Sequence, residues 1–179
     1  MRMRLTNMEL TALSRTGYST RPNKIVYIFA YVYLALFAAA TICYLLAGMS
    51  LFDAVCHAMS VVSTGGFSTR GRSIAAFDSR AVEAATMLFM YLASIHFGII
   101  YISFVTRSLK PLRNPVIKFY TISIMVTALI LSVGLHKSAG GWGSALWQSL
   151  FSTLCISSTT GFAIVDNASW PMWMLVLRG

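Results

Sequence analysis

Two short segments share a residue pattern suited to binding a cation. They read STGGF at residues 63–67 and STTGF at residues 158–162. Glycine permits backbone angles that other residues resist, so consecutive carbonyls in such a segment can point the same way. Threonine hydroxyls add further oxygen atoms. Because hard cations favour oxygen ligands, and potassium filters are built from backbone carbonyls, the pattern predicts two cation-binding backbone segments.

An apolar segment of 12 residues precedes each motif. These segments are Leu51–Val62 and Leu146–Ser157. As a helix, 12 residues cover about 18 Å, roughly half of a bilayer. Ser50 is placed to cap the first segment, and Asp53 lies where the helix dipole favours an anion. The chain can enter the membrane as a half-helix, turn at the glycines and return. The alternative is an amphipathic helix on the membrane surface, followed by a turn.

An internal repeat favours the re-entrant path. Shifting the sequence by 95 positions aligns residues 51–54 with 146–149 and residues 63–67 with 158–162. Two unrelated surface loops would rarely share spacing, an apolar lead-in and a Gly-Phe turn. Gly66 and Gly161 are the glycines that both copies contain, so we expect them to adopt the special backbone geometry.

Three longer apolar segments can cross a bilayer. Ile25–Ala47 and Ala84–Thr106 have 23 residues each, and Phe119–Leu135 has 17, which Val116 and Ile117 can extend. A helix of 23 residues reaches about 34 Å, against a hydrocarbon core of about 30 Å. The chain is 57% hydrophobic and 11% charged, whereas soluble domains are about 25% charged. The sequence predicts an all-α membrane protein in contact with lipid and excludes an ordinary cytosolic domain.

Basic residues gather on one side of these spans. Nine of the fourteen lysines and arginines precede residue 25 or lie between residues 107 and 118. The positive-inside rule places both segments, and therefore the N-terminus, in the cytoplasm. Because these residues flank helices and lack interleaved aromatic residues, we expect no nucleic-acid partner.

The motifs and their lead-ins resemble a known family. Residues 48–69, with Phe-Asp-Ala before GGFST, resemble the second pore repeat of the Trk/Ktr/HKT superfamily of potassium transporters, most closely its bacterial Trk-type membrane subunits. Residues 158–162 followed by Ser-Trp-Pro at 169–171 resemble the third repeat. The resemblance covers about Lys24 to Leu177. It implies repeats of span, re-entrant pore loop and span, four around one pore, of which this chain holds about one and a half.

The resemblance also implies which residues line the ion path. Backbone carbonyls of both motifs would form a selectivity filter, at Thr64, Gly65, Gly66, Thr159, Thr160 and Gly161. The flanking residues are Ser63, Phe67, Ser158 and Phe162. K⁺ is the transported ion, and no other metal or cofactor is expected.

The resemblance further implies the organisation, location and partners of the chain. The predicted parts are a cytoplasmic basic segment (1–24), a pore repeat (25–106), a cytoplasmic basic loop (107–118) and a truncated second repeat (119–179). Family members lie in the bacterial inner membrane, form dimers and bind a cytosolic nucleotide-binding regulatory subunit.

Two repeats of four cannot close a pore, and the run Trp170–Leu177 is too short to span. We therefore expect either a fragment of a transporter or a chain that assembles with the missing repeats or with other copies. The alternative function is a membrane-embedded accessory protein, or a non-functional remnant of such a transporter.

No residue set indicates an enzyme, since the sequence offers no acid pair, Ser-His-Asp set or metal-ligand spacing. His96 lies within the second expected span, and we interpret it as a neutral imidazole bonded to a neighbouring helix rather than as a proton relay. We expect His57, beside Cys56, to serve in packing.

Charged residues follow the first motif. Arg70 and Arg72 on the outer side would oppose cation entry, so we expect them to pair with Asp78 or Glu83 or to point away. Asp53 either attracts cations to the mouth or caps its helix.

Overall fold

The computed structural model describes residues 22–95, 99–100, 103, 114–136 and 140–164. These residues form helices and connecting turns without a strand, as the sequence predicts. The helices are α2 (Pro22–Leu46), α3 (Leu51–Val62), the 3₁₀ helix η1 (Ser73–Phe77), α4 (Arg80–Ser94), α6 (Pro115–Leu135) and α7 (Trp142–Ser157).

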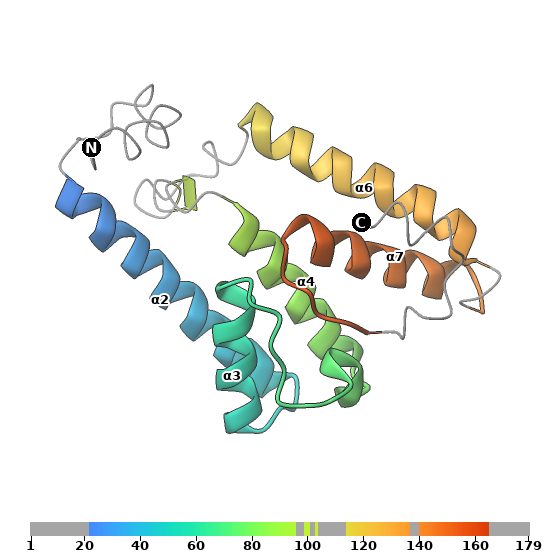
Figure 1. Ribbon diagram of the computed structural model, residues 1–179, viewed down its shortest axis with the longest axis horizontal. Coiled ribbons are helices and arrows are strands. Elements are labelled where there is room, and N and C mark those ends of the chain that lie inside the picture. The colour runs from blue at the N-terminus through green and yellow to red at the C-terminus, as the bar shows by residue number, and fades with distance from the viewer. Residues whose placement is uncertain (1–21, 96–98, 101–102, 104–113, 137–139, 165–179) are drawn as a thin grey trace.

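The order of a long helix followed by a half-helix occurs twice. In Figure 1, α3 folds back onto α2, α7 folds back onto α6, and α4 lies between the two pairs. Helix α4 packs on α2 and α3 of its own repeat and on α7 of the next one. The repeat predicted from the 95-residue shift is therefore present in the fold.

Two of the three predicted spans are long apolar helices. Val26–Leu46 and Pro115–Leu135, 21 residues each, are long and apolar enough to cross a membrane. Their outward faces carry large exposed apolar side chains, including Tyr27, Leu46 and Phe119, which are at least 75% exposed. Continuous apolar surface of this kind is expected against lipid or against another protein.

The third predicted span differs from the structure. The sequence predicted one helix over Ala84–Thr106, but α4 begins at Arg80 and ends at Ser94, and Ile95 is extended (φ −78°, ψ 138°). The Ser94 hydroxyl donates to the carbonyl of Met90 (2.8 Å), and the Ile95 amide donates to Leu92, one residue short of the helical partner. Apolar composition does not reveal this stop, and the predicted residues beyond Ile95 lie mostly outside the described residues.

Side-chain caps explain where α6 and α3 begin. Asn114 caps α6 by accepting from the Val116 amide (3.0 Å), and Pro115 follows at the first helical position. Ser50 caps α3 as predicted, accepting from the Asp53 amide (3.2 Å). The half-helix Leu51–Val62 has its predicted bounds, and α7 begins four residues before the predicted Leu146.

Some predictions lie outside the described residues. They concern most of the basic segment 1–24, most of the basic loop 107–118, His96 and the run Trp170–Leu177.

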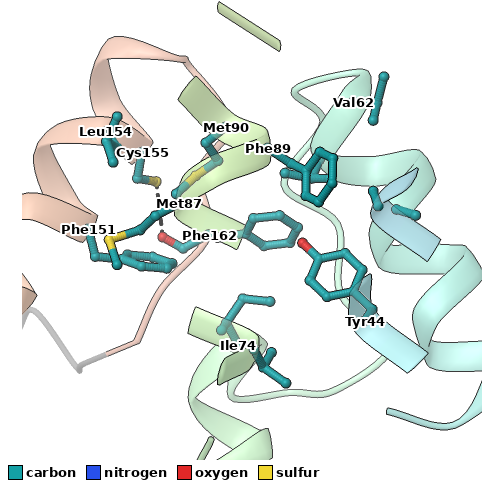
Figure 2. Packing of buried hydrophobic residues seen from close by; sticks show 14 of the residues in the cluster. Tyr44, Val62, Ile74, Met87, Phe89, Met90, Phe151, Leu154, Cys155 and Phe162 are labelled. Atoms are coloured by element: carbon teal, nitrogen blue, oxygen red, sulfur yellow. Dashed lines mark hydrogen bonds between the residues drawn. The ribbon is translucent and has the colours of Figure 1, made fainter. Parts of the chain in front are cut away.

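The core joins the two repeats. Figure 2 shows Tyr44 of α2, Ile74 of η1 and Met90 of α4 around Phe162, the last residue of the second motif. Phe151 and Cys155 of α7 belong to the same cluster, and all six side chains are at most 2% exposed. The second motif is therefore packed into the first repeat.

Core packing can be tested on a single helix. Met90 is fully buried on α4, whereas Leu88 is 52% exposed. We expect Met90→Ala to lower the free energy of unfolding by about 2–5 kcal/mol through the cavity it leaves. Leu88→Ala should change it by less than about 1 kcal/mol. Unfolding of the full chain in detergent measures both, and equal losses would contradict the assigned core.

Candidate functional site

The first motif begins where α3 ends. The Thr64 amide donates to Val61 (3.2 Å) and the Gly65 amide donates to Ser60 (2.8 Å). This pair of bonds is the Schellman motif, which satisfies the last carbonyls of a helix and turns the chain away from its axis.

The second motif repeats the first one bond for bond. The Thr159 amide donates to Ile156 (2.9 Å) and the Thr160 amide donates to Cys155 (3.0 Å), each group lying 95 residues after its counterpart. The predicted repeat therefore extends to individual hydrogen bonds.

Four residues at these corners adopt left-handed backbone angles. Gly66 (φ 69°) and Gly161 (φ 85°) do so, as the sequence predicted. Thr64 (φ 53°) and Thr159 (φ 57°) do so as well, which was not predicted. A β-branched residue in this region is strained by about 1–3 kcal/mol. The sequence held no signal for this strain, since Ser-Thr pairs are common.

The six proposed filter carbonyls are free of hydrogen bonds from the described residues. The carbonyls belong to Thr64, Gly65, Gly66, Thr159, Thr160 and Gly161. The flanking serines instead bond back to their own helices, Ser63 to Met59 (2.8 Å) and Ser158 to Cys155 (3.3 Å). Main-chain oxygens that accept no hydrogen bond from the described residues are available to a cation, whereas the serine hydroxyls already donate to helix carbonyls.

The two corners lie against each other. A Cβ atom built on Gly66 would be 1.8 Å from the carbonyl oxygen of Thr160, so only glycine fits there. A Cβ built on Gly161 would have nothing within 4 Å. The C-terminal ends of α3 and α7, where the helix dipole is negative, both meet this place, and that field favours a cation.

The two motif phenylalanines differ in burial. Phe162 is buried (1% exposed) and stacks on His57 with ring centroids 6.0 Å apart, whereas Phe67 is 81% exposed. Phe162 therefore holds the second corner against the first repeat. Among the described residues, no comparable packing buries the Phe67 ring.

Asp53 holds the chain that follows the first motif. Its buried carboxylate accepts from Ser50 (2.9 Å), Thr69 and Arg70 (2.8 Å). The sequence had predicted that Arg70 pairs with Asp78 or Glu83 or points away, whereas the structure pairs it with Asp53. Asp53 is closer because the Arg70 chain returns over the start of α3. The Asp53 carboxylate pairs with Arg70, and the cap of α3 is the Ser50 hydroxyl, which accepts from the Asp53 amide.

His57 is buried and packed, as predicted. Its Nδ1 atom lies 2.7 Å from the carbonyl oxygen of Asp53, and its Nε2 atom lies 2.8 Å from the Ser68 hydroxyl. The roles of Ser68 and Thr69 were missed, although the polar run after Phe67 was a usable signal.

Glu83 joins the two repeats at α4 and α7. It accepts from Arg80 of its own helix (3.2 Å) and from the indole nitrogen of Trp147. The Arg80 guanidinium lies over the Trp147 ring, 5.2 Å from its centroid.

The Asp53 pairing predicts a dependence of stability on pH. Hydrogen bonds from Thr69 and Arg70 lower the pKa of Asp53 from 3.8 to about 2. Because the pKa is lowered in the folded state, the carboxylate stabilises the fold above about pH 4, and this contribution is lost as the pH falls through 2. We expect Asp53→Asn to lower the free energy of unfolding by about 1.5–3 kcal/mol at pH 7, and the difference to shrink below pH 4.

Asp78 is the matched control, because it is exposed. Asp78→Asn keeps a residue that tolerates its left-handed backbone and should change stability by less than about 0.5 kcal/mol. Denaturation in detergent at pH 2–7 measures both variants. A constant difference for Asp53→Asn across this range would contradict the assignment.

Comparisons with known proteins agree with this architecture. The chain is 31% identical to the Trk system potassium uptake protein TrkH of Vibrio parahaemolyticus over 82% of its length, and 34% identical to TrkG of Escherichia coli over 80%. It spans about a third of these relatives, 31% and 30% respectively. The crystal structure of the potassium transporter TrkH from Vibrio parahaemolyticus superposes with a TM-score of 0.84 at 30% identity, covering 97% of this chain and 38% of that one.

A family model agrees with these relatives. The model described as TrkH, cation transport protein, matches residues 22–134, which include the first repeat and the long helix of the second. The chain therefore belongs to the TrkH family of cation transport proteins.

Proposed function

We propose that this chain contributes two filter segments to a potassium-uptake transporter. The observation that carries the proposal is the set of six carbonyls, at residues 64–66 and 159–161 of two facing corners, that accept no hydrogen bond from the described residues. A dehydrated K⁺ ion would replace its lost water with these oxygens. No cofactor or covalent chemistry is needed.

The energetics support a passive ion path. Half-helix dipoles offset part of the dehydration of the ion. The membrane potential supplies about 2.3 kcal/mol per charge per 100 mV, which favours cation accumulation in the cytoplasm. The chain would lie in the bacterial inner membrane with its N-terminus inside, as the positive-inside rule predicts.

Further pore segments must complete the ring. Phe162 is buried among side chains of the preceding repeat. An equivalent packing site for the exposed Phe67 would come from one more repeat before residue 22. Exposed Phe52 and Met59 on α3 extend the same apolar surface. The missing repeats, from a longer polypeptide, a companion chain or a second copy, are the expected partner. A cytosolic nucleotide-binding regulator is expected from the resemblance.

A chimaera tests the transport proposal. Residues 22–164 would replace the matching part of the Escherichia coli TrkG protein, in a strain that lacks potassium uptake. We expect growth at low potassium and saturable Rb⁺ uptake. The matched control is the same chimaera with Thr64, Gly65 and Gly66 deleted. A chimaera that reaches the membrane in normal amount but gives no more uptake than the deletion would overturn the proposal.

The two filter glycines should differ in how strongly their substitution by alanine lowers ion selectivity. Both have positive φ, so alanine strains either corner, but only at Gly66 would the added Cβ strike the facing Thr160 carbonyl. We expect Gly66→Ala to lower the K⁺ over Na⁺ uptake ratio of the chimaera at least about tenfold, the equivalent of about 1.4 kcal/mol. Gly161→Ala should lower the ratio less. The reverse order, or unchanged ratios, would show that the corners do not form the filter.

A further inference from the structure

The three residues after Phe67 are all tied to α3. The Ser68 hydroxyl meets His57, and Thr69 and Arg70 both donate to Asp53. The Ser68 hydroxyl also accepts from the Arg70 amide (3.1 Å). The returning chain is therefore fixed at each successive residue by a side chain of the half-helix. We call Asp53, His57 and Arg70 the polar clamp.

The second repeat cannot form this clamp. The residues 95 positions after Asp53 and His57 are Gln148 and Ser152, and those after Ser68 and Thr69 are Ala163 and Ile164. Gln148 carries no charge, and Ala163 and Ile164 lack the hydroxyls that Ser68 and Thr69 supply in the first repeat. The second filter segment must therefore be held in another way.

The first repeat supplies that support through η1. The Ala163 amide donates to the Ser73 hydroxyl (3.2 Å), and the Ala75 amide donates to the Ala163 carbonyl (3.2 Å). Ser73 has a left-handed backbone (φ 55°), a strain that persists where the surroundings fix the conformation. The residue that follows Phe162 is thus bonded on both sides to η1.

Phe77 connects η1 to the polar clamp. Its ring meets the His57 imidazole edge to face, with centroids 5.2 Å apart. The Arg70 guanidinium lies 5.8 Å from the centroid of the same ring. His57 also stacks on Phe162 itself. A continuous set of contacts therefore runs from Asp53 through Phe77 and η1 to the second motif.

We propose that the polar clamp of the first repeat positions both filter segments, the first directly and the second through η1. Asp53, His57 and Arg70 are positioning residues, which act on the carbonyls through the backbone and do not contact the ion. The consequence for ion selectivity rests on the proposed function, whereas the structural link from the clamp to Ala163 does not.

Hydrogen exchange tests the structural link without transport. Arg70→Gln removes a donor to Asp53, and Arg72→Gln removes the same charge from an exposed neighbour whose side chain makes no capping bond. In the full chain in detergent, we expect the Ala163 amide to exchange at least about tenfold faster in Arg70→Gln and unchanged in Arg72→Gln. Equal exchange in both variants would overturn the proposal.

Two further variants separate a positioning role from general destabilisation. Arg70→Lys retains a cationic donor and should restore most of the protection at Ala163. Ser73→Gly removes the hydroxyl while relieving the left-handed strain, so it should expose the Ala163 amide but leave the amides of Thr64 and Gly65 protected. Loss of protection throughout the chain in either variant would refute a specific path through η1.

Selectivity provides the functional readout. In the chimaera, Arg70→Gln should lower the K⁺ over Na⁺ uptake ratio about tenfold while Arg72→Gln leaves it within about twofold. An unmodified chimaera that does not transport would count against the proposed function alone. The hydrogen-exchange test at Ala163 does not depend on transport. A transporting chimaera whose ratio is unchanged in Arg70→Gln would overturn the clamp as a determinant of selectivity.

Discussion

A threonine in a left-handed conformation terminates both half-helices, and the rest of the site depends on this turn. The Schellman bonds at Thr64 and Thr159 satisfy the last carbonyls of α3 and α7, and the carbonyls that follow accept no hydrogen bond from the described residues. Backbone at membrane depth tolerates such oxygens only where protein or a polar path meets them. Because the same strained geometry occurs twice, 95 residues apart, it follows from the shared pattern rather than from one local irregularity.

The two corners share backbone geometry but differ in how they are secured. Charged and polar side chains hold the first corner, through Asp53 and His57. Apolar burial of Phe162 and two backbone bonds at Ala163 hold the second. A polar network fixes the orientation of the backbone that it holds, because each hydrogen bond has a preferred geometry. Apolar packing fixes the position of that backbone but constrains its orientation less. The position of the second corner therefore depends on contacts with the first repeat.

The sequence predicts what depends on composition and spacing. The half-helix Leu51–Val62, its cap at Ser50 and the glycine corners follow from local rules, and the structure agrees with all three. It does not predict features that depend on tertiary contacts. The partner of Arg70 is one such feature, because the path of the returning chain decides which carboxylate the guanidinium meets.

The pairing of Arg70 resolves an electrostatic difficulty. An unpaired guanidinium near a cation path would repel the ion by about 4 kcal/mol at 4 Å and an effective dielectric constant of 20. The Asp53 carboxylate lies 2.8 Å from Arg70 and is itself 5% exposed, so the pair presents little net charge to its surroundings. The negative ends of α3 and α7 then remain the dominant field at the corners. Arg70 beside the proposed filter is therefore compatible with the proposed cation path, because its charge is balanced by Asp53 of the half-helix that precedes the motif.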